Sequence, residues 1–259
     1  MGTFFLYDSP QSIRDHKHVT LKIGTRKALE RKLRVLRHFA TIRTNHAGSQ
    51  IIRQMFDDFA INGKHGLFHG VVYPPLAISV KTFRGMLPKR ALPIGLLKLV
   101  LNHVFLSLDF LHTEAKVIHT GKAAVIQEEN SRLIRPLFTD IQESNILLGM
   151  NEETAKQDLE KFEEQELNSP CARKIDGERI IYTSRPLAPS LYPYGRPILS
   201  DFGEARFGEY DNMADIQPYQ YRAPEVIFDI PWDEKVDIWN VGVMVRAKLV
   251  LDEDQMQVG

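Results

Sequence analysis

The alternation of apolar and polar residues predicts a small sheet in the first part of the chain. Short β-like runs lie at residues 3–7, 18–23 and 67–73, separated by turn-rich or charged stretches. Residues 25–39 carry leucines and a phenylalanine at helical spacing, with charges on the other faces, which predicts an amphipathic helix. We therefore expect a sheet-rich unit that carries one helix.

Helical periodicity dominates further along the chain. Pro93 stands where a helix could begin, and the apolar stripe that follows it runs to His112, so we expect this helix to be largely buried. Residues 151–167 form another helical candidate, but they are crowded with Glu and Asp, which favours a solvated face over a binding site. The proline-rich stretch 168–197 is interpreted as an irregular surface insert.

These patterns predict an α+β fold of two lobes, with a sheet-rich small lobe and a helical large lobe. A ligand cleft is expected between the lobes. We place part of the small lobe and the connecting hinge at residues 1–76, and part of the large lobe at residues 77–259.

Composition narrows the classes of function. The chain has 259 residues, of which 43% are apolar, enough for a sizeable core. Lys plus Arg equals Asp plus Glu at 33 each, so charge favours neither nucleic acid nor a membrane surface as partner. The single cysteine, Cys171, excludes an internal disulfide and fits a reducing compartment, the cytoplasm and/or the nucleus. We expect neither a secretory signal at the start nor a membrane-spanning segment.

Four motifs follow one another in a fixed order. They are VTLKI with Lys22, DIQESNILLG with Asp140 and Asn145, SDFGEA with Asp201, and IQPYQYRAPEV, which contains an APE motif. Each motif alone could have a purely structural explanation: an edge-strand lysine can reach water, and a DFG triplet can be a plain turn after a strand. The occurrence of all four motifs in this order makes a purely structural explanation improbable.

Together the motifs supply what phosphoryl transfer from ATP requires: a cation on the phosphates, oxygen ligands for magnesium and a carboxylate for the attacking hydroxyl. Lys22 is the candidate for the phosphates, because an ammonium inside an apolar run needs an anion. Asp201 and Asn145 are the candidate Mg²⁺ ligands. Asp140 is the candidate that orients the substrate hydroxyl.

The ordered set resembles a eukaryotic-type protein kinase, and its details resemble the SR-protein kinases of the fungal branch. The runs DIQPYQYRAPEV, VTLKI and LDFLHTEAKVIHT and the acidic spacer carry this narrower resemblance, which covers residues 3–244 apart from one insertion. It implies a monomeric serine/threonine kinase that uses ATP and Mg²⁺. It also implies protein substrates with serine in arginine-rich segments, such as splicing factors, and no direct contact with nucleic acid.

The same resemblance assigns further residues. Tyr73 would be the gatekeeper, and the hinge at residues 74–76, beginning with Pro74, would hold adenine. Because Pro75 has no N–H, the Leu76 amide would be the hinge donor. In VDIWNVG, Asp237 would anchor the catalytic-loop backbone from a buried helix.

The activation segment lacks the parts of a phosphorylation switch. No Ser or Thr lies between Phe202 and Glu225, and Thr120 stands where many kinases carry an arginine beside the catalytic aspartate. Both halves of the usual arginine–phosphate pair are therefore missing. We expect a constitutively shaped segment.

Three departures from the kinase pattern affect the site. No G-x-G-x-x-G precedes Lys22, so the phosphate-covering loop is expected to be missing. Lys32 stands where the family's helix carries a glutamate, so two like charges should meet; Glu30 points about 200° away on the helix. Residues 121–139 separate Thr120 from Asp140. We interpret this insertion as retained intron sequence, with a natural surface loop as the alternative.

After about residue 244 the chain no longer follows the kinase pattern, so the remainder of the large lobe is expected to be missing. These departures motivate an alternative from a non-enzyme class: a catalytically impaired pseudokinase or gene-model fragment that acts, if at all, as a binding module. A small-molecule phosphotransferase is a third candidate, which the APE motif disfavours.

Overall fold

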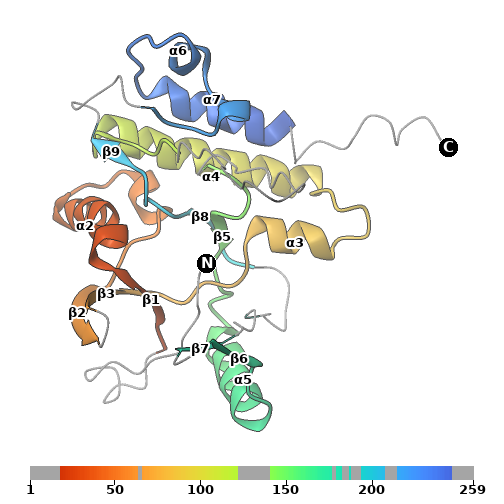
Figure 1. Ribbon diagram of the computed structural model, residues 1–259. Coiled ribbons are helices and arrows are strands. Elements are labelled where there is room, and N and C mark those ends of the chain that lie inside the picture. Colours follow the sequence, from red (N-terminus) through yellow and green to blue (C-terminus); the bar gives the residue numbers. More distant parts are fainter. Residues whose placement is uncertain are drawn as a thin grey trace.

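The computed structural model describes residues 18–63, 66–121, 141–176, 179–182, 187, 194–207 and 215–246. The predicted strand at residues 3–7, nearly all of the insertion 121–139 and the predicted catalytic residue Asp140 lie outside this described part. The described chain forms a mixed α and β structure with two lobes, as the sequence predicted (Figure 1).

The small lobe contains an antiparallel sheet in the order β1-β3-β2. The strands are β1 (Thr20–Thr25), β2 (Asp57–Gly63) and β3 (Gly66–Tyr73). Strand β1 pairs with β3, and Lys22 of β1 lies opposite Val71 of β3. Strands β1 and β3 confirm the predicted runs, whereas β2 was not predicted. Its sequence, DDFAING, begins with two aspartates and ends in Asn-Gly, which weakens the alternation that marks a strand.

Helix α2 (Arg26–Thr41) packs on this sheet and confirms the predicted amphipathic helix. Its apolar stripe is buried: Leu29, Leu33, Leu36 and Phe39 are each at most 5% exposed. Among the side chains of α2 that the structure describes, the charged residue Lys32 is also buried, at 5% exposed. A lysine is rarely buried to this extent unless it meets an anion, so its position marks a polar site beneath the helix.

The large lobe is built around α4 (Ile94–Thr113), which crosses the middle of the molecule in Figure 1 with α7 (Lys235–Met244) above it. Short elements surround these helices. They are α3 (Val80–Met86), β4 (Val117–Ile118), β5 (Ile146–Leu148), β8 (Pro197–Leu199), β9 (Arg206–Phe207), η2 (Tyr219–Tyr221) and α6 (Pro224–Ile227). The antiparallel pairs β5–β8 and β4–β9 lie against α4 on the side of the small lobe.

Helix α4 is the one described helix that is long and apolar enough to cross a membrane, with a mean hydropathy of 1.7. Core helices pass the same test, and α4 behaves as one: Val100, Val104, Leu108 and Leu111 are at most 1% exposed. They belong to the main core, which also contains the apolar face of α2. The buried face confirms the apolar stripe, but the prediction of a largely buried helix was wrong in part, because Ile94, Leu99, Phe105 and Leu106 of the same helix are exposed.

The turn η1 (Ala47–Gln50) approaches α4 closely at Gly48. A Cβ atom on Gly48 would lie 2.1 Å from the carbonyl oxygen of Leu106 and 2.7 Å from the Cβ of Phe110. Only glycine fits this contact without a shift of the backbone. The segment that follows α2 is thereby held against the large lobe.

The prediction of an irregular insert at residues 168–197 was wrong in part. Strands β6 (Arg173–Asp176) and β7 (Arg179–Tyr182) form an antiparallel pair within it, beside the predicted acidic helix α5 (Ala155–Asn168). The short β-like runs RKID and RIIY were outweighed in the sequence by the prolines around them. Helix α5 has the expected exposed face, and Asp158 and Leu159 are its buried residues.

The strand that ends before Asp201 is fixed by the small lobe as well as by the large lobe. Leu199 forms a parallel bridge with Ile52, which follows η1. The Leu199 amide donates to the Ile51 carbonyl at 2.9 Å, and the Arg53 amide donates to the Leu199 carbonyl at 2.7 Å. Backbone bonds from both lobes therefore set the position of the Asp201 backbone.

Candidate active site

A cavity of about 340 Å³ opens between the two lobes and brings the predicted site residues together. Lys22 enters it from β1, Lys32 from α2, Asn145 from the loop before β5, and Asp201 from the end of β8. Tyr73, the last residue of β3, also lines it. Residues far apart in the sequence thus share one cleft at the position where the sequence analysis expected a ligand.

Lys22 and Lys32 both contact the carboxylate of Asp201. The Lys22 Nζ lies 3.4 Å from Asp201 Oδ1, and the Lys32 Nζ lies 2.7 Å from the same oxygen. Burial raises the pKa of the Asp201 carboxyl, but the two adjacent ammonium groups outweigh burial and hold that pKa below its usual range. Asp201 is therefore ionised at neutral pH and serves as the counter-ion of both lysines.

The expectation that Lys32 and Lys22 meet is confirmed. Burial lowers the pKa of Lys22, and the positive charge of Lys32 lowers it further, whereas Asp201 raises it. Glu30 lies on the exposed side of α2 and does not replace the missing acid. The arrangement is a triangle in which one carboxylate holds two ammonium groups together.

The backbone and the following side chain fix Asp201 in place. Asp201 has a positive φ of 68°, a conformation that Asp tolerates better than most residues. Phe202 is fully buried and packs edge-on against Phe39 of α2, with ring centroids 5.0 Å apart. Its ring also lies 5.0 Å from that of His119. Phe202 therefore links α2 to the residues that precede the catalytic loop.

The predicted metal ligands Asp201 and Asn145 lie in the same cavity, and the Asn145 carbonyl accepts from the amide and the hydroxyl of Ser200 at 2.8 and 2.7 Å. The charges around Asp201 do not favour a magnesium ion. Asp201 Oδ1 already faces two ammonium groups, and no cluster of three acidic, histidine or cysteine side chains occurs among the described residues. Magnesium prefers several oxygen ligands with few competing cations. The magnesium assignment stays a prediction that the local charge does not favour.

Arg53 is a site residue that the sequence analysis missed. It lines the cavity behind Tyr73, and its guanidinium carbon lies 4.4 Å from the centroid of the Tyr73 ring. Burial raises the pKa of the Tyr73 phenol to about 12, so the phenol stays neutral. Arg53 stands in IIRQMF, where no local pattern distinguishes it from a surface arginine. Only the fold of the loop after η1 brings it into the cleft.

The predicted hinge residues lie next to the cavity. Tyr73 is 2% exposed and lines it, and its assignment as gatekeeper stays a prediction. Beyond the hinge, Ala77 and Ile78 line the cavity and bond to Leu148 through the backbone, at 2.9 and 2.8 Å. Pro74 and Leu76 are not among its lining residues, and the adenine contacts assigned to them remain predictions.

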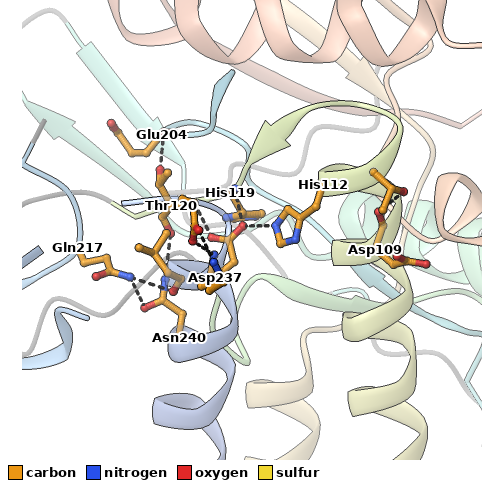
Figure 2. A network of polar contacts seen from close by, with 12 residues as sticks. Asp109, His112, His119, Thr120, Glu204, Gln217, Asp237 and Asn240 are labelled. Carbon is orange, nitrogen blue, oxygen red and sulfur yellow. Dashed lines mark hydrogen bonds and ion pairs between the residues drawn. The ribbon is translucent and has the colours of Figure 1, made fainter. Parts of the chain in front are cut away.

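The predicted anchor Asp237 is confirmed. This carboxylate, from the first turn of α7, is fully buried. Its oxygens accept from the backbone amides of His119 and Thr120, both at 2.8 Å. The His112 Nε2 lies 2.9 Å from the same group, and Figure 2 shows the carboxylate at the centre of these contacts. Asp237 thus fixes the backbone just before the insertion.

A second set of contacts continues from this anchor into the activation segment (Figure 2). The buried side chain of Gln217 donates to Asn240 Oδ1 at 2.9 Å and accepts from the Ala223 amide at 2.8 Å. Asn240 in turn donates to the Thr120 carbonyl at 3.3 Å, and the Thr120 hydroxyl donates to the Glu204 carbonyl at 2.7 Å. Neutral side chains and backbone groups therefore connect Thr120 to the activation segment on both sides of Asp237.

A buried ion pair supports the loop between Ile141 and Asn145. Arg84 of α3 donates to both carboxylate oxygens of Glu143, each at 2.7 Å, and the Glu143 side chain is 2% exposed. This bidentate geometry fixes the loop to α3. The sequence analysis did not single out either residue, because an arginine and a glutamate 59 positions apart carry no local signal of pairing.

The two-lobed arrangement and the order of the site residues are consistent with the protein-kinase fold that the sequence predicted. No protein-family model matches the chain. A serine/threonine protein kinase of Aspergillus fumigatus is 37% identical over 238 residues, which cover 91% of this chain and 52% of the relative. The serine/threonine-protein kinase SRPK of Physarum polycephalum is 27% identical over 74% of this chain and 44% of the relative. Protein kinase dsk1 of Schizosaccharomyces pombe is 21% identical over 85% of this chain and 53% of the relative.

The chain is a homologue of serine/threonine protein kinases, and its relatives include an SRPK and fungal kinases. The predicted resemblance is confirmed at this level. The chain spans about half the length of the curated relatives it matches. All of these relatives are named kinases, so the comparisons give no support to the alternative of a pseudokinase.

Proposed function

We propose that this chain belongs to an enzyme that transfers the γ-phosphoryl group of ATP to serine in a protein substrate. The observation that carries the proposal is the convergence of Lys22, Asn145 and Asp201 on one cavity in a kinase homologue. In the reaction the serine hydroxyl oxygen forms a bond to the γ-phosphorus. The bond from that phosphorus to the bridging oxygen breaks, and ADP leaves.

Five of the predicted residues have a proposed task. Lys22 binds phosphate oxygens, as an ammonium held near an acid at the cleft can do. Asp140 orients the serine hydroxyl and accepts its proton. Tyr73 closes the back of the adenine site, and the Leu76 amide donates to adenine. Asp201 holds the lysines in position, because its carboxylate contacts both ammonium groups.

We further propose substrates with serine in arginine-rich segments, such as splicing factors. The support is the motif DIQPYQYRAPEV together with the relatives named SRPK and dsk1. The exposed acidic side chains of α5 offer a favourable surface to a basic peptide. A location in the cytoplasm and/or nucleus, and a monomeric state, complete the proposal.

Radiolabelled ATP and an arginine–serine repeat peptide test the function directly. The assay is run with MgCl₂ and, separately, with EDTA, and we expect label on the peptide in at least one condition. Lys22→Met and Asp140→Asn should each reduce transfer by about a hundredfold or more. Arg34→Met, on an exposed position of α2, is the matched control and should retain transfer. No transfer by the unaltered chain in either condition would refute the proposal.

The effect of the insertion can be separated from this question. Transfer by the chain as it stands is compared with transfer by a variant that lacks residues 121–139, in which Thr120 directly precedes Asp140. We expect the shortened variant to be faster, because a catalytic carboxylate must be placed within about an ångström. Equal rates would show that the insertion leaves the loop intact, and sequencing of the mature transcript would show whether its codons are retained.

A further inference from the structure

Three cationic side chains and one acid line the inner end of the cavity. The cations are Lys22, Lys32 and Arg53, and the acid is Asp201. Both lysines contact the same oxygen, Asp201 Oδ1, at 3.4 and 2.7 Å. The lining therefore carries an excess of positive charge that Asp201 does not neutralise.

Arg53 has no counter-ion of its own in the described structure. Its Nε and Nη2 atoms are shielded from solvent and have no hydrogen-bond partner among the described residues. It meets the face of the Tyr73 ring instead, 4.4 Å from the ring centroid. A shielded guanidinium with free N–H groups is unfavourable unless an anion completes the site. Its position on the cavity wall indicates where that anion would enter.

Lys32 occupies the place that a metal ion would need. Its ammonium lies 2.7 Å from Asp201 Oδ1, and the Lys32 side chain is 6% exposed, so it cannot move into solvent without a change in α2. A divalent cation that binds Asp201 Oδ1 would have to displace this ammonium, and it would enter beside three positive side chains. A triphosphate brings negative charge that these same side chains can bind.

We propose that Lys32 takes the place of a divalent metal ion on Asp201, and that the cavity binds the triphosphate of ATP through Lys22, Lys32 and Arg53 without a metal. This inference rests on the proposed function, because it keeps ATP as the ligand of the same cavity. The inference differs from the proposed function in the cation that stands beside the phosphates. The ammonium group of Lys32, which is present before the nucleotide binds, replaces a metal ion that would bind together with the nucleotide.

Calorimetric titration of the unaltered chain with ATP, once in excess EDTA and once in excess MgCl₂, tests the proposal without any variant. We expect the affinity in EDTA to equal that in MgCl₂ within about threefold, or to exceed it. Adenosine titrated in EDTA should bind at least about tenfold more weakly than ATP, because it lacks the phosphates. Binding of ATP that is at least about tenfold tighter in MgCl₂ than in EDTA would overturn the proposal.

Charge reversal at Lys32 tests the role of this residue. In Lys32→Glu we expect the affinity for ATP in EDTA to fall at least about tenfold, and MgCl₂ to restore most of it, because Asp201 is released. Arg34→Glu changes the net charge equally on an exposed position of the same helix and should behave like the unaltered chain. An unchanged affinity of Lys32→Glu in EDTA would contradict the proposal.

Lys32→Met provides a second variant that removes the charge and keeps the length of the side chain. We expect it to lose most of the preference for ATP over adenosine in EDTA, with thermal melting as the check on folding. Metal-dependent binding together with phosphate transfer would overturn this inference and leave the proposed function intact. No binding of ATP in either condition would overturn both.

Discussion

Asp237→Asn alters a carboxylate that is fully buried and surrounded by three donors. Asparagine has the same shape but presents one oxygen and one NH₂ group, so at least one backbone donor, from His119 or Thr120, would face another donor. A hydrogen bond to a charged acceptor contributes about 1.5–3 kcal/mol, and a buried donor left without an acceptor costs about 1–3 kcal/mol. We expect the free energy of unfolding to fall by about 3 kcal/mol.

A loss of that size is a large part of the roughly 5–15 kcal/mol by which a domain is stable. Urea denaturation measures it, and two tryptophans report on the region concerned: Trp232, which is 3% exposed, and Trp239 of α7, which is 44% exposed. The slope of the transition should be unchanged, so that the midpoint alone moves.

The matched control for this prediction is Asp109→Asn. Asp109 also pairs with a histidine, His46, at 3.0 Å, but its side chain is 57% exposed. Exposed ion pairs contribute about 1 kcal/mol or less. If Asp237→Asn destabilises the chain by no more than this control, the carboxylate does not anchor the catalytic-loop backbone in the way proposed here.

Three further predictions follow from packing, from a buried ion pair and from a buried histidine. Gly48→Ala should destabilise the chain by about 1–3 kcal/mol, because its Cβ would lie 2.1 Å from a backbone carbonyl oxygen of α4; Gly85→Ala, with open space around it, should be nearly neutral in the same thermal melts. Arg84→Met should destabilise by about 3 kcal/mol in urea because it leaves Glu143 buried and unpaired, and adding Glu143→Gln should recover part of the loss; a loss below about 1 kcal/mol would contradict this reasoning. Burial lowers the pKa of His119, so the unfolded chain binds a proton near pH 6.5 at this histidine whereas the folded chain does not. The free energy of unfolding should therefore be greatest above about pH 6.5 and should decrease as the pH falls. His119→Gln should remove up to about 1.4 kcal/mol per pH unit of this dependence in denaturation curves between about pH 7.5 and 5, and equal slopes for both chains would refute it.

Sequence periodicity predicted the helices that pack against the core through one apolar face. Helices α2 and α4 were found because one face of each is almost wholly apolar and buried. Strand β2 was missed, and the pair β6–β7 was taken for loop, because acidic residues, glycines or prolines around these short strands conceal the alternation. Short strands depend on the neighbours with which they pair, and those neighbours are distant in the sequence or outside any local pattern.

The site was predictable where spacing carries the signal. Lys22, Asn145 and Asp201 lie in motifs of fixed spacing, and the structure brings them to one cavity. Lys32 was noticed because it departs from such a motif. The position of Lys32 could be read from the sequence, but the 2.7 Å contact with Asp201 could not, because it depends on how α2 packs on the sheet.

Arg53 was not predictable from its own surroundings. Its role depends on the bridge between Ile52 and Leu199, which draws the segment after η1 to the back of the cavity. The same holds for Arg84 and Glu143, whose pairing follows from the position of α3. The roles of these residues depend on contacts between helices and strands that are distant in the sequence. Such contacts cannot be predicted from the local pattern of a single sequence.

The bridge between Ile52 and Leu199 has a mechanical consequence. The backbone bonds of Ile51 and Arg53 to Leu199 join the segment between α2 and β2 to the strand that ends before Asp201, at the back of the cleft. The same segment is held on the large lobe, because Gly48 packs against α4 and the Ser107 hydroxyl of α4 donates to the Ile51 carbonyl. We therefore expect the back of the cleft to serve as the pivot when the lobes tilt, so that the entrance can widen while the Asp201 backbone keeps its place.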